Sequence, residues 1–585
     1  MIDALTQALH DALHRLRLHL AAPRALLALG VMGVLTGALA ALVIIAFRFV
    51  VEGTQGLLLP GGGAEDYESL PAVVRLALPI AGALLIGLVF QSAAAGARQV
   101  GVVHVMERLA YFQGRLPFKN ALLQFVGAGL AIISGHSVGR EGPGVHLGAA
   151  AGSLLGQGLE LPNNSLRTLV ACGVAAAIAA SFNTPLAGVV FSMEVVMMEY
   201  TVAGFAPVIL AAVTATTLLH LAFGKEHFLS VPTAELGTTG ELALVALLGL
   251  LTGVLAATYI QLLQFFSTQA SGRPLWWRLT LAGTITGLCA LPAPEIMGIG
   301  YDTLSATLLG HLGVTTLVTV LVLKMLATTA GIGLGLPGGL IGPTLIIGAM
   351  AGALAGAALE WAAPGVVASP AIYAMLGMVA MMGATLQAPL AALTAILELT
   401  GNPNLIMAGM LAVIIADLTS FRLFGKDSVF LELLRARGMD YRADPLTQSL
   451  CRIGAAAAMN PRLAACPQTL TTAEARAVLE RQPQWLLVDS EGEERTALAA
   501  ADLARWLTQR RHKEHEVVDL LALPARRLRA LPIDLRATLQ EAHSLLEQSQ
   551  ADALYVRQTT APLFSRVYGL LTRQDIESAY RQSLG

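Results

Sequence analysis

Long apolar runs separated by short polar interruptions make up the chain as far as about residue 435. Ala25–Val51 and Ala72–Phe90 are each long enough to cross a bilayer core, which takes about 20 residues of helix. Shorter apolar segments follow at about 120–138, 144–158, 166–181, 186–198 and 203–222. Segments this short predict tilted or partial helices that meet near the midplane of the membrane.

A second series of apolar segments repeats the landmarks of the first. It runs through about 242–265, 277–292, 313–333, 340–362, 370–384, 390–398 and 404–416. Asn183-Thr-Pro-Leu-Ala187 in the first series matches Gln387-Ala-Pro-Leu-Ala391 in the second, and a glutamate follows each proline by nine residues. A glycine-rich break ending in proline precedes each copy, at Gly139–Pro143 and Gly338–Pro343. These matches predict two related halves, with a transport site where the broken helices meet.

Beyond about residue 435 charged residues become frequent, and the pattern changes to two similar units. Leu479–Val488 and Leu546–Val556 each read as an amphipathic helix followed by a short apolar strand, and another helix follows each unit. The expected fold is an all-α polytopic membrane domain with a C-terminal α+β domain. We expect an N-terminal helix at 1–24, a membrane domain at 25–435 with halves at about 25–222 and 242–435, and a tail at 436–585 with copies at about 452–508 and 518–582.

The composition agrees with a chain that lies mostly in lipid. Hydrophobic residues make up 55% and charged residues 13%, against about 25% charged residues in a soluble domain. The net charge of −2 gives no reason to expect nucleic acid as a partner. No nucleophile–base set, phosphate-binding loop or metal-ligand spacing is present, which argues against an enzyme and a metal site. Arginines ahead of the first apolar run favour a cytoplasmic N-terminus: Arg15, Arg17 and Arg24.

The stretch Gly139–Pro143 places an ionisable pair inside an apolar region. No charged residue occurs from Ala121 to Gly139, yet Arg140 and Glu141 follow directly. An ionisable residue at such a depth is costly and marks a functional site. Proline suits the first turn of a helix, where the free N–H groups and the positive end of the helix dipole favour an anion. The stretch therefore predicts an anion site in the membrane.

With Gly139–Pro143, Asn183-Thr-Pro-Leu-Ala-Gly188 and Gly338–Pro343 in this order, the chain resembles the CLC family of chloride channels and proton-coupled chloride antiporters. The tail resembles the paired CBS domains that many members carry. The resemblance implies a homodimer in the bilayer, inverted halves and one chloride pathway per subunit. Glu141 then corresponds to the gating glutamate, which competes with chloride and swings away when protonated. The anion ligands would be backbone amides near Arg140, Glu141, Gly142, Leu340, Ile341 and Gly342.

Three positions depart from the family pattern. Val100 falls where the family has a serine beside the anion, and Phe430 falls where it has an inner tyrosine, so two hydroxyl ligands are replaced. Val195 falls where antiporters carry an inner proton-transferring glutamate, as in members that conduct passively. Glu199, one helical turn further on, is a candidate substitute. The resemblance thus favours passive, voltage- or pH-gated chloride conduction controlled by Glu141.

Three alternatives stay open. A proton–chloride antiporter with a non-standard inner proton site is the first, and a fluoride exporter, a branch that also departs at the serine position, is the second. The third is a nucleotide-sensing regulator, because Thr572 and Asp575 resemble the segment with which some CBS pairs hold an adenine nucleotide. No cofactor is required by any motif. The family's range and the N-terminal charges favour a bacterial inner membrane with both termini cytoplasmic.

Overall fold

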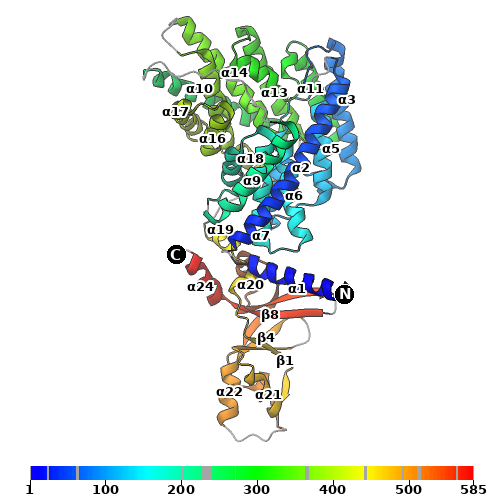
Figure 1. Ribbon diagram of the computed structural model, residues 1–585, viewed down its shortest axis with the longest axis vertical. Helices are drawn as coiled ribbons and strands as arrows, with labels where there is room; N and C mark the ends of the chain where they lie inside the picture. The colour runs from blue at the N-terminus through cyan, green and yellow to red at the C-terminus, as the bar shows by residue number, and fades with distance from the viewer. Residues whose placement is uncertain are drawn as a thin grey trace. The chain divides into compact units, whose positions relative to one another are not determined.

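The protein is described from a computed structural model. It covers residues 2–22, 25–60, 65–200, 202–224, 240–270, 272–362, 368–439, 445–489, 493–509, 516–561 and 564–583. The chain divides into two compact units. The membrane unit comprises Gly30–Leu155 and Arg167–Arg442, and the strand unit comprises Met1–Leu29, Gly156–Leu166 and Ala443–Gly585. Figure 1 shows their elements coloured along the chain.

The described part of the membrane unit is helical in both halves. The first half contains α2 (Leu26–Leu58), α3 (Ala72–Ser92), α4 (Gly101–Tyr111), α5 (Phe118–Ile133), α6 (Glu141–Gly158), α7 (Asn163–Phe182), α8 (Pro185–Phe191) and α9 (Val202–Phe223). The second half contains α10 (Glu241–Gln269), α11 (Leu275–Ala290), α12 (Tyr301–Leu308), α13 (Val314–Leu334), α14 (Ile341–Ala362), α15 (Pro370–Leu386), α16 (Pro389–Thr400), α17 (Ile406–Leu418) and α18 (Val429–Ala436). Eight described helical segments are long and apolar enough to cross a membrane, so this is a multi-pass membrane protein.

The two Pro-Leu-Ala landmarks are matched helix breaks. Asn183 follows α7 and Gln387 ends α15, and both take left-handed backbone conformations, with φ of 59° and 52°. Asn tolerates this conformation better than most residues, and the proline two positions later starts the next helix with a preset φ. The internal repeat of the sequence is therefore a repeat of backbone geometry.

Small residues let the central helices of each half pack backbone to backbone. A Cβ atom added at Gly148 on α6 would lie 2.2 Å from the carbonyl oxygen of Gly173 on α7. In the second half, a Cβ added at Gly348 on α14 would lie 2.4 Å from the carbonyl oxygen of Gly377 on α15. Such contacts allow close helix approach in lipid, where van der Waals packing drives association. The pair α6 and α7 thus corresponds to α14 and α15.

The apolar pattern of the sequence did not predict three short helices of the membrane unit. α4 precedes the segment expected near 120–138, α12 follows the segment near 277–292, and α18 follows the segment near 404–416. Each has only eight to eleven residues. A window this short does not establish a helical period, so these helices were missed.

The described strand unit is an α+β structure with an internal repeat. Its six-stranded sheet has the order β1-β3-β4-β6-β7-β8, from β1 (Leu463–Cys466), β3 (Trp485–Val488), β4 (Arg495–Ala499), β6 (Leu528–Asp534), β7 (Ala553–Ala561) and β8 (Phe564–Thr572). β1 and β3 are parallel and β4 is antiparallel to β3, and β6, β7 and β8 repeat this arrangement. β2 (Thr469–Thr471) and β5 (Val517–Asp519) form a separate pair.

Helices follow the same repeat in the strand unit. Between the parallel strands of the two copies lie α21 (Thr472–Glu480) and α23 (Leu539–Ser549), and after the hairpins come α22 (Ala500–Gln509) and α24 (Arg573–Ser583). The sequence pattern predicted both helix–strand units. The remaining helices of this unit are α1 (Ile2–Leu20), α19 (Pro445–Cys451) and α20 (Ala455–Ala458).

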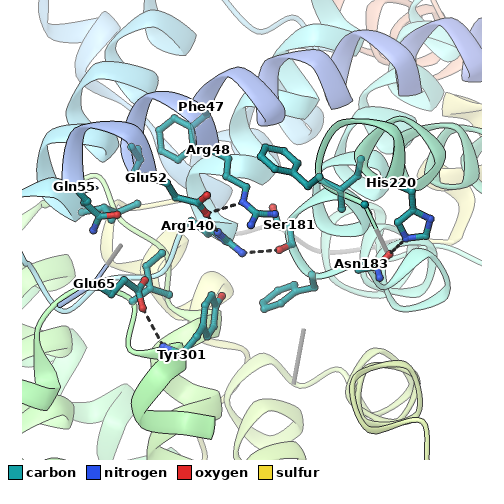
Figure 2. Close-up of a pocket in the computed structure, with 17 residues that line it drawn as sticks. Phe47, Arg48, Glu52, Gln55, Glu65, Arg140, Ser181, Asn183, His220 and Tyr301 are labelled. Carbon is teal, nitrogen blue, oxygen red and sulfur yellow. Dashed lines mark hydrogen bonds and ion pairs between the residues drawn. The ribbon is translucent and has the colours of Figure 1, made fainter. Parts of the chain in front are cut away.

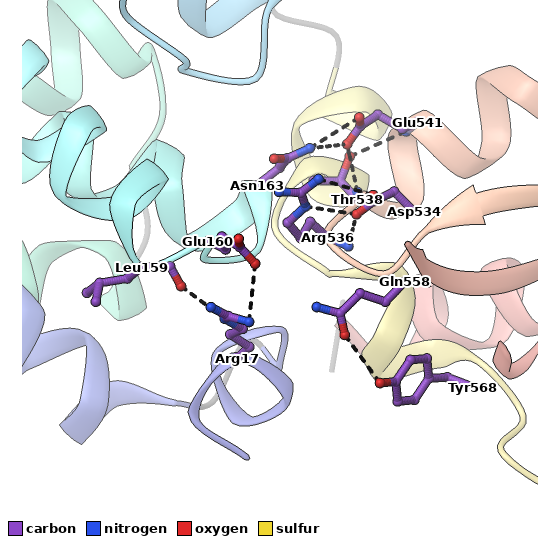
Figure 3. Close-up of polar contacts among 10 residues, drawn as sticks. All are labelled: Arg17, Leu159, Glu160, Asn163, Asp534, Arg536, Thr538, Glu541, Gln558 and Tyr568. Carbon is purple, nitrogen blue, oxygen red and sulfur yellow. Dashed lines mark hydrogen bonds and ion pairs between the residues drawn. The ribbon is translucent and has the colours of Figure 1, made fainter. Parts of the chain in front are cut away.

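The loop that joins α6 to α7 packs inside the strand unit. The Asn163 amide nitrogen Nδ2 donates to the Glu541 carboxylate at 3.0 and 3.2 Å, and the Asn163 N–H donates to the Arg536 carbonyl at 2.9 Å. Arg17 of α1 donates to the Leu159 carbonyl at 3.0 Å and forms an ion pair with Glu160 at 3.3 Å. Figure 3 shows these contacts. The N-terminal helix and the second copy of the tail therefore hold this loop together.

Candidate anion site

The two glycine breaks of the repeat meet and exchange hydrogen bonds. The Gly139 N–H donates to the Gly339 carbonyl at 2.9 Å, and the Gly339 N–H donates to the Gly139 carbonyl at 2.8 Å. α6 begins at Glu141, two residues after the first break, and α14 begins at Ile341, two residues after the second. Two helix N-termini, each with free N–H groups and a positive dipole end, therefore come together inside the membrane unit.

The Glu141 carboxylate occupies the space between these helix starts. Its side chain is fully buried. Oε2 accepts a hydrogen bond from the Gly342 N–H of α14 at 3.3 Å, and Oε1 accepts one from the Tyr301 hydroxyl. A Cβ atom at Gly139 would lie 2.2 Å from Oε2, so only glycine leaves room for the carboxylate there. A carboxylate thus takes the position that a helix N-terminus offers to an anion.

On one side of Glu141 lies a first cavity of about 240 Å³, lined by both positive and negative side chains. Arg140 donates to the Glu52 carboxylate at 3.1 Å and to the Ser181 carbonyl at 3.1 Å, and Arg48 donates to the same carboxylate at 2.6 Å. Figure 2 shows Glu52 with both arginines, and Glu65 beside Tyr301. The Arg140 side chain is therefore engaged in an ion pair, and its backbone remains the predicted ligand.

A second cavity of about 630 Å³ is lined by arginines. Its walls include Val100, Phe430, Gly142 and Leu340, together with Arg98, Arg273, Arg278 and Arg437. Among the described residues that line this cavity there is no carboxylate. A cleft lined by one sign of charge raises the local concentration of the opposite ion. The structure thus brings both predicted hydroxyl replacements to one basic cavity, on a shared wall with the helix starts.

Gln124 ties the start of α4 to the second glycine break, and the sequence did not single it out. Its Oε1 accepts the Gly101 N–H at 2.6 Å, and its Nε2 donates to the Pro337 carbonyl at 3.1 Å. The side chain is fully buried. The signal available in the sequence was that Gln124 is the one amide side chain in the charge-free run from Ala121 to Gly139. Gln124 therefore fixes the backbone beside Val100.

The repeated glutamates cap each other's half. Glu194 accepts the Leu390 and Ala391 N–H groups of α16 at 3.2 and 2.6 Å. Glu398 accepts the Leu186 and Ala187 N–H groups of α8 at 2.8 and 2.7 Å. Each carboxylate satisfies two free donors at a helix N-terminus. Both glutamates thus connect the two halves of the membrane unit.

Val195 and Glu199 do not lie on one continuous α-helix. Val195 is buried within a π-helical turn, Ser192–Met197, at the end of α8. Met198 then takes a left-handed conformation with φ of 52°, and Glu199 follows the end of the helix. The spacing of one helical turn that suggested Glu199 as a substitute therefore does not apply to this backbone.

In the strand unit, Thr572 and Asp575 cap the first turn of α24. The Asp575 carboxylate accepts the Thr572 N–H at 2.8 Å and its hydroxyl at 2.7 Å, and the Asp575 N–H donates back to that hydroxyl at 3.3 Å. Thr538 and Glu541 form the same capping box at α23. Nucleotide binding there stays a prediction. No group of three or more metal-ligating side chains is arranged around a common centre in the described residues.

Tyr301 is the principal site residue that the sequence did not reveal. It is the first residue of α12 and follows Gly298-Ile-Gly300, a break with positive φ at both glycines. The signal available in the sequence was that Tyr301 follows a glycine break between two apolar segments. Its contact with Glu141 spans 160 positions of the sequence, which no local pattern predicts.

Comparison with known proteins adds independent findings. Residues 82–420 match the family model described as voltage gated chloride channel. The chain is 34% identical over 417 residues to a putative chloride channel protein, ClcB-like, of Ralstonia nicotianae, covering 69% of this chain and 96% of that protein. It is 29% identical to the voltage-gated ClC-type chloride channel ClcB of Citrobacter koseri, covering 67% of this chain and 96% of that protein.

Solved structures are similar in fold. A slow cyanobacterial Cl⁻/H⁺ antiporter has a TM-score of 0.61 at 23% identity, covering 70% of this chain and 97% of that chain. A eukaryotic CLC transporter has a TM-score of 0.59 at 20% identity, covering 94% of this chain and 97% of that chain. The second of these matches extends over the strand unit as well as the membrane unit, because it covers nearly the whole chain.

Proposed function

Because the chain belongs to the voltage-gated chloride channel family, we propose that it conducts chloride passively and that Glu141 gates the pathway. Membership confirms the resemblance carried by Gly139–Pro143, Asn183-Thr-Pro-Leu-Ala-Gly188 and Gly338–Pro343. The observation that carries the proposal is the Glu141 carboxylate at the N-terminus of α14, where it accepts the Gly342 N–H. An ionised carboxylate excludes chloride from these amides, and protonation removes its charge and its claim on them.

The two cavities give the gate a pathway to control. The second cavity reaches Gly142 and Leu340 at the helix starts, and its arginines attract anions from the adjoining solution. Backbone N–H groups bind a halide without a fixed positive charge, so chloride also leaves readily. Val100 and Phe430 supply no hydroxyl at this wall. We therefore expect the central site to bind chloride more weakly than a site with both hydroxyls. Each absent neutral hydrogen bond should reduce the binding free energy by about 1 kcal/mol.

Passive conduction is supported by the surroundings of Val195. A buried valine carries no proton. The neighbouring Glu194 accepts two N–H groups of α16 and so acts as a helix cap. At the position where the family's antiporters have an inner proton donor, this chain therefore has Val195. The carboxylate next to it, Glu194, caps a helix.

Chloride efflux from proteoliposomes, recorded together with external pH, tests the proposal. We expect rapid efflux that requires valinomycin, because chloride movement carries net charge. An opposing chloride gradient should drive no proton movement. Proton uptake against its own gradient would contradict passive conduction, and efflux of fluoride much faster than chloride would favour a fluoride exporter. Empty liposomes and heat-inactivated protein are the controls.

One observation favours proton-coupled antiport as the second candidate. Asp417 of α17 interacts electrostatically with Glu194, and its Oδ1 is buried without a hydrogen-bond partner among the described residues. A buried carboxyl oxygen without a donor is well suited to hold a proton. If protons are driven by chloride, Asp417→Asn should abolish the proton movement and leave chloride efflux intact. In that event Asp417 takes the place of the glutamate missing at Val195.

The proposal also covers the oligomeric state of the protein, its orientation in the membrane and the ligand of its C-terminal tail. The family resemblance supports a homodimer in a bacterial inner membrane. Arg15 and Arg17 precede the first membrane helix, which supports cytoplasmic termini by the excess of positive charge on that side. The repeated strand unit supports a CBS pair, with an adenine nucleotide as its candidate ligand near Thr572.

A further inference from the structure

Tyr301 connects the first cavity to the gate. Its hydroxyl donates to Oε1 of Glu141. Tyr301 lines the first cavity, whereas Glu141 is not among the described residues that line it. The tyrosine therefore contacts both the cavity and the gate carboxylate.

The Tyr301 ring is held from two directions. The Arg140 guanidinium carbon lies 5.3 Å from the centre of the ring, within cation–π distance. The Phe182 ring packs edge-on against it, with ring centres 6.2 Å apart. Figure 2 shows Tyr301 next to Glu65 in the wall of the cavity. The direction of the phenol is thus fixed by packing as well as by its hydrogen bond.

The backbone of Tyr301 is anchored by Glu65. The Glu65 carboxylate accepts the Gly300 N–H and the Tyr301 N–H at 3.3 Å each, at the start of α12. Gly300 has φ of 85°, and a Cβ atom there would lie 3.0 Å from Nζ of Lys324. Lys324 in turn donates to the Ile296 carbonyl at 3.0 Å. The loop before α12 is therefore held from both ends.

We propose that Tyr301 is a positioning residue that latches the Glu141 carboxylate in the anion position and sets the acidity at which the gate opens. This rests on the proposed function of Glu141. A phenol that donates to an ionised carboxylate stabilises the charged form more than the neutral one. The latch therefore keeps the gate closed down to a lower pH than the same carboxylate would reach alone. Protonation weakens the bond and frees the carboxyl group from the amides.

Other charged groups around the gate act on the same equilibrium. Arg140 favours the ionised carboxylate, and Glu52 partly neutralises Arg140 through their ion pair. Glu65, whose carboxylate accepts the Tyr301 N–H, interacts electrostatically with Asp302 and Lys324, and Lys324 also interacts with Asp302. Burial raises the pKa of Glu65 to about 7, with Asp302 adding to the rise and Arg140 opposing it. Since Glu65 titrates in the range where the gate is tested, its contribution needs a separate variant.

The test is chloride efflux as a function of pH, equal on both sides of the liposome. We expect Tyr301→Phe to move the half-maximal pH upward by about one unit, a tenfold change in proton affinity, without lowering the maximal rate. Replacing Tyr301 by 3-fluorotyrosine, which has a more acidic phenol and so is a stronger donor, should move it downward. A shift in neither direction would overturn the latch.

Matched variants separate the latch from general damage. Tyr67 is another buried tyrosine of this region, and its hydroxyl donates to the Ile132 carbonyl at 2.6 Å and accepts from Gln55 at 2.9 Å. Tyr67→Phe should leave the pH profile unchanged, and an equal shift there would overturn the proposal. Glu65→Gln keeps an oxygen for the Tyr301 N–H and removes the titration. The shift caused by Tyr301→Phe should persist in that background, and its disappearance would assign the effect to Glu65.

The variant Glu141→Gln distinguishes failure of the gate from failure of the latch alone. Glu141→Gln should make efflux independent of pH, and Tyr301→Phe should have no further effect in that background. If Glu141→Gln keeps the pH dependence, the proposed gate fails and the latch with it. If Glu141→Gln is flat and Tyr301→Phe has the profile of the unmodified protein, the gate stands and only the latch is overturned.

Discussion

The two halves of the membrane unit share a backbone plan and differ in the side chains at the same place. In each half a glycine break leads into a helix, α6 or α14, whose start faces the other break. The first break continues as Arg140 and Glu141, and the second as Leu340 and Ile341. Only the first half therefore supplies a carboxylate that competes for the amides. Both halves thus present backbone N–H groups at the meeting point, and only the first half adds a carboxylate there, which accepts the Gly342 N–H.

The two cavities show the same division. The first cavity pairs Arg140 and Arg48 with Glu52, so its charges largely cancel. Four arginines and no carboxylate are found among the described lining residues of the second cavity. The second cavity is therefore the one whose lining attracts anions, whereas the lining of the first has charges of both signs. Variants placed at matching positions of the two halves test how far the likeness extends.

The largest effect is expected where the halves are alike in packing. Gly152→Ala on α6 would place a Cβ 2.1 Å from the Leu169 carbonyl oxygen, and Gly352→Ala on α14 would place one 1.9 Å from that of Tyr373. Overpacking of this kind costs about 1–3 kcal/mol or more. Both variants should yield little folded protein in size-exclusion chromatography. Gly53→Ala, with no atom within 4 Å of its Cβ, is the control and should behave as the unmodified protein.

The next effect should separate the halves. Glu141→Gln removes the competing charge, so the ratio of efflux rates at acidic and neutral pH should fall to about 1. Ile341→Val, at the matching start of α14, should keep the pH dependence and cost only about 0.5–1.5 kcal/mol of stability. Flux assays over a pH series measure the first and thermal melting the second. A gate shared equally by both halves would make the two variants alike.

A smaller and equal loss is expected from the crosswise caps. Glu194→Gln and Glu398→Gln each replace a charged cap of two N–H groups by a neutral one. Cap substitutions cost about 0.5–2 kcal/mol, so both should lower the melting temperature by similar amounts. The exposed Glu360→Gln near the end of α14 is the control. Loss of transport in Glu194→Gln with an unchanged melting temperature would instead indicate a proton-carrying role.

The smallest effect concerns the repeat of the strand unit. Thr538→Ala and Thr572→Ala remove corresponding helix caps, at α23 and α24, and each should cost about 1 kcal/mol. Thermal melting of the full-length protein compares them. If Thr572 also holds an adenine nucleotide, ADP should raise the melting temperature of the unmodified protein and of Thr538→Ala, but not of Thr572→Ala. A rise in all three would place the nucleotide elsewhere.

Local pattern was sufficient wherever a feature is long or repeated. The apolar runs predicted the long helices, and the proline landmarks predicted the matched breaks that the left-handed Asn183 and Gln387 produce. It failed at α4, α12 and α18, which are too short to show a period. It also failed at Glu199, because the helix of Val195 ends in a left-handed turn at Met198. The sequence showed that the glutamate at position 194 is repeated in the second half, but it did not show that this glutamate caps a helix.

The sequence by itself determined the family, the two halves and the position of Glu141, because these depend on spacing along one segment. Only the tertiary structure decided what surrounds Glu141. The Tyr301 hydroxyl, the Gly342 N–H and the Glu52 partner of Arg140 come from distant elements. Their meeting depends on how helices with small-residue faces pack against one another, which no single stretch of the sequence specifies.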